Sequence, residues 1–251
     1  MRTAAILPVK SFARAKQRLG GSVADPLRLE LARAMVADVL LALARTRSIE
    51  LTILVTRERS VLKAARELGA LAVHDDAEAG QSAAAALGVR TALAEGMERV
   101  LCVPGDCPAL DPAELEALLD DERSASLTGP YREAPAGRPV SRSRGDGGPA
   151  GVIIVPDRHG TGTNGLLISP PDAIRPSFGP GSCQRHRALA LAAGIPWRVE
   201  RPGSLLLDVD TGADLAALRE RLSGESARAS RTRAVLVQPE RPHGLTIKTT
   251  A

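Results

Sequence analysis

The feature that most constrains the fold is a regular alternation of short apolar runs with longer segments of helical period in the first half of the chain. Short, continuous apolar runs are typical of strands buried on both faces, and the segments between them are typical of covering helices. The expected strands are residues 4–9, 51–55, 71–73 and 99–104, and the expected helices are residues 25–47, 58–68, 81–96 and a helix opened by Asp111-Pro112. The alternation predicts an α/β fold with a parallel, doubly wound sheet that binds ligands at the carboxyl ends of its strands.

The second half of the chain is less regular. Residues 123–149 are rich in Gly, Pro, Ser and Arg, which predicts a long mobile loop. Order is expected to resume with a strand at 151–156, an apolar run at 165–168, a helix at 183–193, a strand at 195–199 and a last helix at 213–222. We therefore expect one domain over residues 1–224 and a loosely ordered tail over 225–251.

Composition narrows the class of protein. The chain has 251 residues and only 2% aromatic residues, so its core must be built from Leu, Val, Ile and Ala. Its three cysteines have no disulfide or metal-ligand spacing, which is typical of reduced thiols in a cytoplasmic protein. No apolar run approaches the roughly 18 residues of a membrane span, so no membrane partner is expected.

The net charge of +4 does not indicate a basic binding face. Residues 123–150 carry +3 and the tail from Glu225 carries +3, which leaves −2 for the rest of the chain. Since aromatic residues are also scarce, the composition argues against nucleic acid as a partner.

Two glycine-rich turns lie between residues 157 and 182. The first, DRHGTGT, follows the strand at 151–156, and the second, FGPGS, directly precedes a predicted helix. Free backbone amides and a helix N-terminus both favour negative charge, so the pair could form an anion cradle. Two ordinary connecting turns would have the same composition.

Charged residues follow two of the predicted strands. Lys10, Arg14, Lys16 and Arg18 lie in the loop after the first strand and could neutralise a polyphosphate, although a solvated basic loop is the simpler interpretation. Asp106 follows the fourth strand, where a carboxylate commonly binds a divalent metal or, alternatively, caps a turn.

A third charged loop holds Asp208 and Asp210. Residues two apart on an extended segment point the same way, so the two carboxylates could share a metal ion or a lysine. The alternative is that Asp210 caps the last helix together with nearby Asp214.

The sequence contains none of the usual motifs of nucleophilic, P-loop or zinc chemistry: no G-x-S-x-G, Walker A, HExxH or paired CxxC. Of the four histidines, only His159 adjoins a candidate site. Cys107 neighbours Asp106 without an evident base, which favours a small packed thiol over a nucleophile.

Five motifs, in order, carry a resemblance to a known family: PVKSFARAKQRL, VPGDCPAL, PDRHGTGTN, FGPGS and LDVDT. Over residues 3–222 the chain resembles the 2-phospho-L-lactate or phosphoenolpyruvate guanylyltransferases of coenzyme F-420 biosynthesis, the CofC/FbiD family. The resemblance implies a three-layer α/β/α nucleotidyltransferase fold, GT-A-like and Rossmann-like, with a mostly parallel sheet. It also implies GTP as cosubstrate, Mg²⁺, and a three-carbon phosphoacid as acceptor.

The resemblance assigns roles residue by residue. The acceptor-binding positions fall on Thr163, Gly179 and Ser182. The metal-binding aspartates fall on Asp106 and on the DVD segment, at Asp208 or Asp210. The triphosphate would be held by Lys10, Lys16 and Arg18. No protein nucleophile is implied, so catalysis would rest on positioning and charge neutralisation.

The sequence departs from the family at Gly80-Gln81-Ser82, where a Gly-Leu-Asn-like turn is usual. This altered turn leaves open a nucleotide-binding module without turnover, although the intact Asp106 and DVD carboxylates argue against it. A second alternative is a related transferase that acts on another acceptor, such as a sugar phosphate or the molybdopterin cofactor, and the FGPGS turn argues against that one. The next enzyme of the pathway is a candidate partner, and a homodimer is left open.

Overall fold

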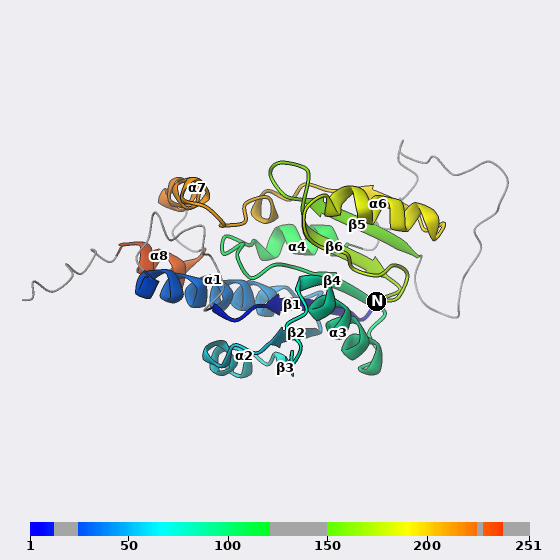
Figure 1. Cartoon of the computed structure of the whole chain (residues 1–251), viewed down its shortest axis with the longest axis horizontal. Coiled ribbons are helices and arrows are strands. Elements are labelled where there is room, and N and C mark those ends of the chain that lie inside the picture. Colours follow the sequence, from blue (N-terminus) through cyan, green and yellow to red (C-terminus); the bar gives the residue numbers. More distant parts are fainter. Residues whose placement is uncertain (13–24, 121–149, 225–227, 238–251) are drawn as a thin grey trace, which may run out of the picture.

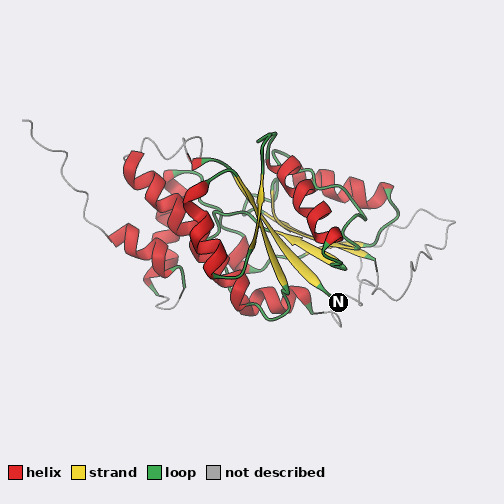
Figure 2. Cartoon of the chain, turned by 90° about the horizontal axis from the view of Figure 1, so that it is seen from below, coloured by secondary structure: helices red, strands yellow, loops and turns green. Residues whose placement is uncertain are grey.

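A seven-stranded sheet lies between two layers of helices in the computed structural model, which describes residues 1–12, 25–120, 150–224 and 228–237 (Figures 1 and 2). The strands are β1 (Thr3–Val9), β2 (Leu51–Thr56), β3 (Leu71–His74), β4 (Arg99–Cys102), β5 (Gly151–Pro156), β6 (Thr163–Ser169) and β7 (Trp197–Val199). Their order in the sheet is β3-β2-β1-β4-β6-β5-β7. The predicted three-layer α/β/α architecture with a mostly parallel sheet is confirmed.

The helices divide between the two faces according to the two-residue period of the strands. Odd-numbered residues of β1, such as Leu7, pack with α1 (Asp25–Arg45), η3 (Arg59–Val61), α2 (Leu62–Glu67) and α4 (Pro112–Leu119). Even-numbered residues, such as Ile6, pack with α3 (Gln81–Ala94) and α6 (Ser182–Ala192). Because both faces are covered, the strands are apolar throughout.

Strand β6 departs from the parallel arrangement that the alternation predicts. It is antiparallel to both of its neighbours, β4 and β5. The connection from β5 is a short loop, residues 157–162, which is long enough only for the chain to turn back beside the strand it has left. As a result the first residue of β6, Thr163, lies at the sheet edge where β1 and β4 end.

Part of the segment expected to be loosely ordered forms a helix. Residues Ser230–Val237 make α8, which packs on α1 and, together with α7 (Gly212–Ser223), forms a separate apolar cluster. Buried Asp38 of α1 accepts hydrogen bonds from the backbone N–H groups of Arg231 and Thr232. The cap of α8 is thus supplied from about 190 residues away along the chain, by α1 rather than by any residue local to the helix, which is why the local sequence pattern does not indicate it.

Other helices expected from the sequence are present, but some begin or end at different residues. Asp111 caps α4 through a hydrogen bond from Ala113 N–H, as the sequence predicts. The expected helix at 58–68 is split into η3 and α2. The expected mobile loop at 123–149 lies outside the described residues. Within the described part of the chain, no helix is both long and apolar enough to span a bilayer.

Candidate active site

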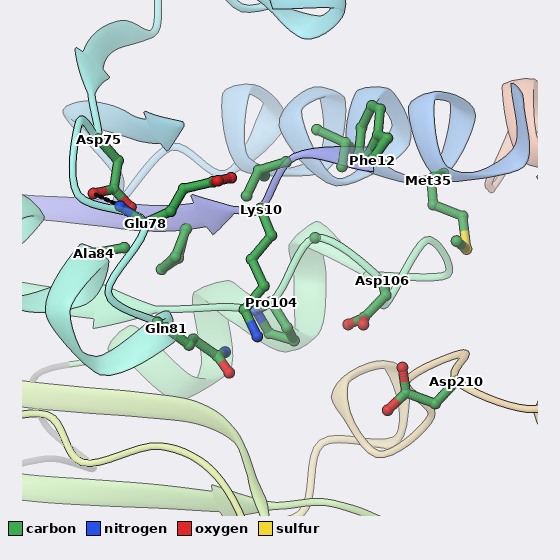
Figure 3. A pocket seen from close by; sticks show the side chains of 16 residues that line it. Lys10, Phe12, Met35, Asp75, Glu78, Gln81, Ala84, Pro104, Asp106 and Asp210 are labelled. Atoms are coloured by element: carbon green, nitrogen blue, oxygen red, sulfur yellow. Dashed lines mark hydrogen bonds between the residues drawn. The ribbon is translucent and has the colours of Figure 1, made fainter. Parts of the chain in front are cut away.

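A cavity of about 270 Å³ opens at the carboxyl ends of β1 and β4 (Figure 3). Its walls come from the end of β1, the start of α3, the loop after β4 and the DVD segment. The lining includes Lys10, Phe12, Met35, Asp75, Glu78, Gln81, Asp106 and Asp210. This volume lies just below the roughly 300–1,000 Å³ of typical small-molecule sites. The strand-end position agrees with the sequence expectation for ligand binding.

Lys10 and Asp106, which were predicted to act together, do line the same cavity. Lys10 extends from the end of β1 toward Pro104, and Asp106 turns its carboxylate toward Asp210 (Figure 3). The other cations predicted to bind phosphate, Arg14, Lys16 and Arg18, lie outside the described residues.

The DVD segment is held beside Asp106 by its backbone and by its middle residue. Val209 N–H donates to the Asp106 carbonyl oxygen at 3.1 Å. The Val209 side chain is fully buried in the cluster formed by α1, α7 and α8. Since alternate residues of an extended segment point in opposite directions, Asp208 and Asp210 face away from that cluster.

Asp210 does not cap α7, the helix that was expected at residues 213–222. The cap of α7 is Thr211, which forms a reciprocal capping box with Asp214. Asp214 also accepts from Asp210 N–H at 3.1 Å and pairs with Arg158. Burial would raise the pKa of Asp214, but the hydrogen bonds from Thr211 and Asp210 and the charge of Arg158 together lower it. The Asp210 side chain lines the cavity.

Asn164 is a functional candidate that the sequence analysis missed. Its side-chain amide donates to the Asp208 carboxylate at 3.1 Å and to the Leu205 carbonyl at 2.8 Å. Burial and the negative charge of Asp106 raise the pKa of Asp208, with a smaller contribution from Asp210, whereas the Asn164 bond opposes that rise. Asn164 is 6% exposed. A buried amide requires hydrogen-bond partners, but Asn164 lies just before the apolar run expected at 165–168, so the sequence carried no signal of its burial.

Asp106, Asp208 and Asp210 could hold a divalent cation if a bound ligand completed its coordination shell. No three carboxylate, histidine or cysteine side chains of the described residues form a ready metal cage. Mg²⁺, however, usually binds through one or two carboxylates and completes its shell with phosphate oxygens and water. Burial, and then the negative charges of Asp106 and Asp210, raise the pKa of Asp208, and a bound cation would relieve both effects.

In the turn at 157–162 the amides of Gly160, Thr161 and Gly162 all bond within the turn, contrary to the expected anion cradle. Thr161 N–H and Gly162 N–H both donate to the Asp157 carboxylate, at 3.0 and 2.9 Å. A Cβ at position 162 would lie 2.6 Å from Asp157 Oδ2, so glycine is required for this close approach. The anion bound by these amides is the carboxylate of Asp157, which belongs to the turn itself.

A β-bulge turns Thr163 toward α6. Pairing between β5 and β6 skips Asn164, because Val155 pairs with Gly165 and Pro156 with Thr163. Strict alternation from Leu167 would place Thr163 on the α1 face of the sheet, but the bulge reverses the direction of its side chain. The Thr163 hydroxyl instead lies 3.1 Å from His186 Nδ1 on α6.

His186 connects Thr163 to the FGPGS turn, and His159, the histidine singled out in the sequence, does not. Ser177 N–H donates to His186 Nε2 at 2.9 Å, and Phe178 packs edge-on against the ring. Burial, and then the positive charge of Arg185, lower the pKa of His186 from 6.5 to about 4. His159, by contrast, bonds only to neighbouring Arg158 among the described residues.

The depressed pKa of His186 should make stability depend on pH. Between pH 6.5 and 4 the unfolded chain binds a proton that the folded chain does not, so stability is lost as pH falls through this window and is retained above it. We expect this residue to contribute a loss of about 2 kcal/mol in the free energy of unfolding between pH 7 and pH 5. Urea titrations of the wild type and His186→Gln at both pH values measure it. A stability difference between the two proteins that does not change with pH would contradict the assignment.

The FGPGS turn is held together by α6. Arg185 donates to the carbonyl oxygens of Ser177, Phe178 and Pro180. Gly179 and Gly181 adopt φ of +107° and +72°, which disfavour any side chain there. Ser182 starts α6, and its N–H donates to the Gly179 carbonyl at 3.0 Å.

The three predicted acceptor-binding residues are brought together around this turn. Thr163 reaches it through His186, and Cys183 N–H donates to the Thr161 carbonyl at 3.2 Å, which fixes the α6 terminus beside the start of β6. The Ser182 hydroxyl is buried and bonds to no described residue. An enclosed hydroxyl without a partner is uncommon in a folded protein.

Ser82 links this turn to the cavity. Its hydroxyl accepts from Phe178 N–H at 2.8 Å, and the preceding residue, Gln81, lines the cavity. Gly80-Gln81-Ser82, where the sequence departs from the family, thus lies between the cavity and the FGPGS turn.

Ser82→Ala removes that link. We expect a loss of about 1 kcal/mol in the free energy of unfolding, because Phe178 N–H loses its partner. The matched control is Thr91→Ala on the same helix, whose hydroxyl bonds only to the Leu87 carbonyl of its own helix. Denaturant unfolding of both variants compares them, and equal stability losses would show that the Ser82 bond has no special weight.

Cys107 is a packed thiol, as expected. It is fully buried, and its sulfur lies 3.8 Å from the Leu205 carbonyl oxygen. Cys102 and Cys183 are also buried and free.

Comparison with known proteins identifies the family of this chain. Residues 3–134 match the sequence model of the family described as guanylyl transferase CofC like. A phosphoenolpyruvate guanylyltransferase from Conexibacter woesei is 44% identical and aligns over 95% of this chain and 96% of its own length. One from Sphaerobacter thermophilus is 35% identical, over 87% and 93% of the two chains.

Solved structures show the same fold. A crystal structure from Desulfovibrio desulfuricans G20, assigned as a nucleotide-diphospho-sugar transferase, has a TM-score of 0.67 and 18% identity, and the match covers 94% of each chain. CMP:2-keto-3-deoxy-manno-octonic acid synthetase complexed with CTP has a TM-score of 0.55 and 14% identity, over 90% of this chain and all of the other. The family match and the close relatives place this chain in the CofC-like guanylyl transferase family, as an enzyme of the nucleotidyltransferase class.

Proposed function

We propose that this protein transfers GMP from GTP to a small phosphoacid, phosphoenolpyruvate or 2-phospho-L-lactate, and releases pyrophosphate as a step in coenzyme F-420 biosynthesis. Relatives named phosphoenolpyruvate guanylyltransferase support the reaction class and favour phosphoenolpyruvate. The 2-phospho-L-lactate alternative rests on the family resemblance, since both acids present one phosphate and one carboxylate.

The observation that carries the proposal is the adjacency of two different half-sites. The cavity with Lys10, Asp106 and Asp210 has the charges that a nucleoside triphosphate and its metal require. The FGPGS turn, with Thr163, Gly179 and Ser182, would take the second, smaller anion. The two are joined by the Ser82–Phe178 hydrogen bond.

In the reaction, an oxygen of the acceptor phosphate forms a bond to the α-phosphorus of GTP while the bond to the β-phosphate oxygen breaks. Pyrophosphate leaves with that oxygen, so no protein nucleophile is needed. Lys10, with Lys16 and Arg18, would neutralise the triphosphate, and Thr163, Gly179 and Ser182 would hold the acceptor in line with the α-phosphorus. Positioning and charge neutralisation are the main contributions available to such a site.

Asp106, with Asp208 and Asp210, would hold Mg²⁺. The ion would supply charge neutralisation on the phosphate oxygens. Asn164 donates to the Asp208 carboxylate and would restrict its orientation.

A panel of substrates tests the proposal. The protein is incubated with Mg²⁺, each of the four nucleoside triphosphates and, in turn, phosphoenolpyruvate, 2-phospho-L-lactate and 3-phosphoglycerate, and pyrophosphate is measured. We expect release with GTP and one or both of the first two acids, and none without an acceptor. Absence of release in every combination would remove the proposal, and release only with another acceptor or nucleotide would redirect it.

A further inference from the structure

His186 is the one histidine of the described residues that is fully buried beside the proposed acceptor site, and its two ring nitrogens have different partners. A backbone N–H can only donate, so His186 Nε2, which lies 2.9 Å from Ser177 N, must be the unprotonated, accepting nitrogen. In the neutral ring the proton is then on Nδ1. The low pKa of His186 is consistent with a neutral ring at physiological pH.

This tautomer determines what the Thr163 hydroxyl can do. Nδ1–H donates to Thr163 Oγ1 across 3.1 Å, so the hydroxyl acts as acceptor toward the histidine. Its own proton remains to be donated, and none of the described residues accepts it. A hydroxyl that accepts from Nδ1–H cannot turn its proton toward the histidine, so the proton is left for another acceptor.

We propose that His186 is a positioning residue for the guanylyl transfer: by donating from Nδ1 it commits the Thr163 hydroxyl to donate to the acceptor phosphoacid. The inference rests on the proposed function. The oxygens of a phosphate dianion or a carboxylate only accept, so a hydroxyl fixed as a donor matches them, and a freely rotating one pays an entropic penalty to reach the same orientation. His186 itself does not touch the reacting atoms.

Two substitutions separate this role from simple support of the turn. In His186→Asn the side-chain amide can stand in for Nδ1–H and donate to Thr163, but it cannot reach Ser177. In His186→Gln the side-chain oxygen can stand in for Nε2 and accept from Ser177, but the donor to Thr163 is lost. His159→Gln, in the neighbouring exposed turn, is the matched control.

The readout is the split between the two Michaelis constants. We expect His186→Gln to raise KM for phosphoenolpyruvate about 10-fold and to leave KM for GTP within roughly 2-fold, since one hydrogen bond to a charged ligand is affected. His186→Asn should restore the acceptor KM, and His159→Gln should match the wild type. In a Thr163→Val background, His186→Gln should have no further effect on that KM.

The opposite pattern, rescue by Gln and loss with Asn, would assign His186 to the support of Ser177 and overturn the inference, and so would equal rises in the KM values for both substrates. A second measurement does not depend on the variants: NMR of the ¹⁵N-histidine-labelled wild type should show His186 neutral and protonated on Nδ1 at pH 7. A proton on Nε2 refutes the inference. Absence of pyrophosphate release by the wild type would instead refute the proposed function, so the two failures are distinguishable.

Discussion

Asp106→Asn is expected to lower kcat/KM for guanylyl transfer by a factor on the order of 10²–10³, because a neutral amide is a poor ligand for a hard divalent cation. The change is nearly isosteric, so the fold should be retained. Steady-state pyrophosphate release at saturating Mg²⁺ measures the effect.

The control for Asp106→Asn is Asp111→Asn, five residues further along the chain. Asp111 caps α4 and pairs with Arg228, and it does not line the cavity. It should lose some stability and keep its activity. An Asp106→Asn protein with full activity would contradict the metal assignment.

Asn164→Ala is expected to raise the Mg²⁺ concentration for half-maximal activity by roughly 10- to 100-fold, the range found when a group that orients a metal ligand is removed. Without the amide, the Asp208 carboxylate loses a hydrogen bond that opposes the rise in its pKa and fixes its direction. Activity as a function of Mg²⁺ concentration measures the shift.

Activity of Asn164→Ala should recover substantially at high Mg²⁺, because the aspartates themselves are intact. Chelation of the metal should abolish activity in the wild type and the variant alike. An unchanged half-saturation concentration would show that Asn164 supports only the Leu205 carbonyl and has no part in metal binding.

The sheet and its ligand-binding edge could be predicted because they follow from local patterns. Short apolar runs separated by segments of helical period indicate parallel strands with covering helices, and such sheets bind ligands at the carboxyl edge. Lys10 and Asp106 follow strands that end at this edge, so their convergence could be expected. The cap by Asp111 was readable from Asp-Pro at a helix start.

The acceptor half of the site could not be predicted in the same way. The reversal of β6 and the bulge at Asn164 decide which way Thr163 points, and both depend on pairing between strands rather than on local sequence. The turn at 157–162 has the glycines of an anion cradle, but the amides of Thr161 and Gly162 donate to the Asp157 carboxylate. A glycine-rich sequence indicates that backbone amides can be approached closely. It does not indicate which group accepts hydrogen bonds from them.

The sequence patterns do not indicate several hydrogen-bond partners of the site and of α8. In each case the two partners are far apart in the sequence. His186 reaches Thr163 from 23 residues away, and Asn164 reaches Asp208 from 44. The helix α8 is likewise capped by Asp38 from α1. Asn164, His186 and Asp38 are all buried polar residues, which require hydrogen-bond partners, but their burial becomes visible only in the folded structure.

The most direct test of the central claim follows the oxygen atoms. Phosphoenolpyruvate labelled with ¹⁸O in the non-bridging oxygens of its phosphate is incubated with the wild-type protein, GTP and Mg²⁺, and both products are analysed by mass spectrometry. Attack by the acceptor phosphate on the α-phosphorus requires all of the label in the guanylylated phosphoacid and none in pyrophosphate. Label in the released pyrophosphate, or formation of GDP in place of pyrophosphate, would contradict the account.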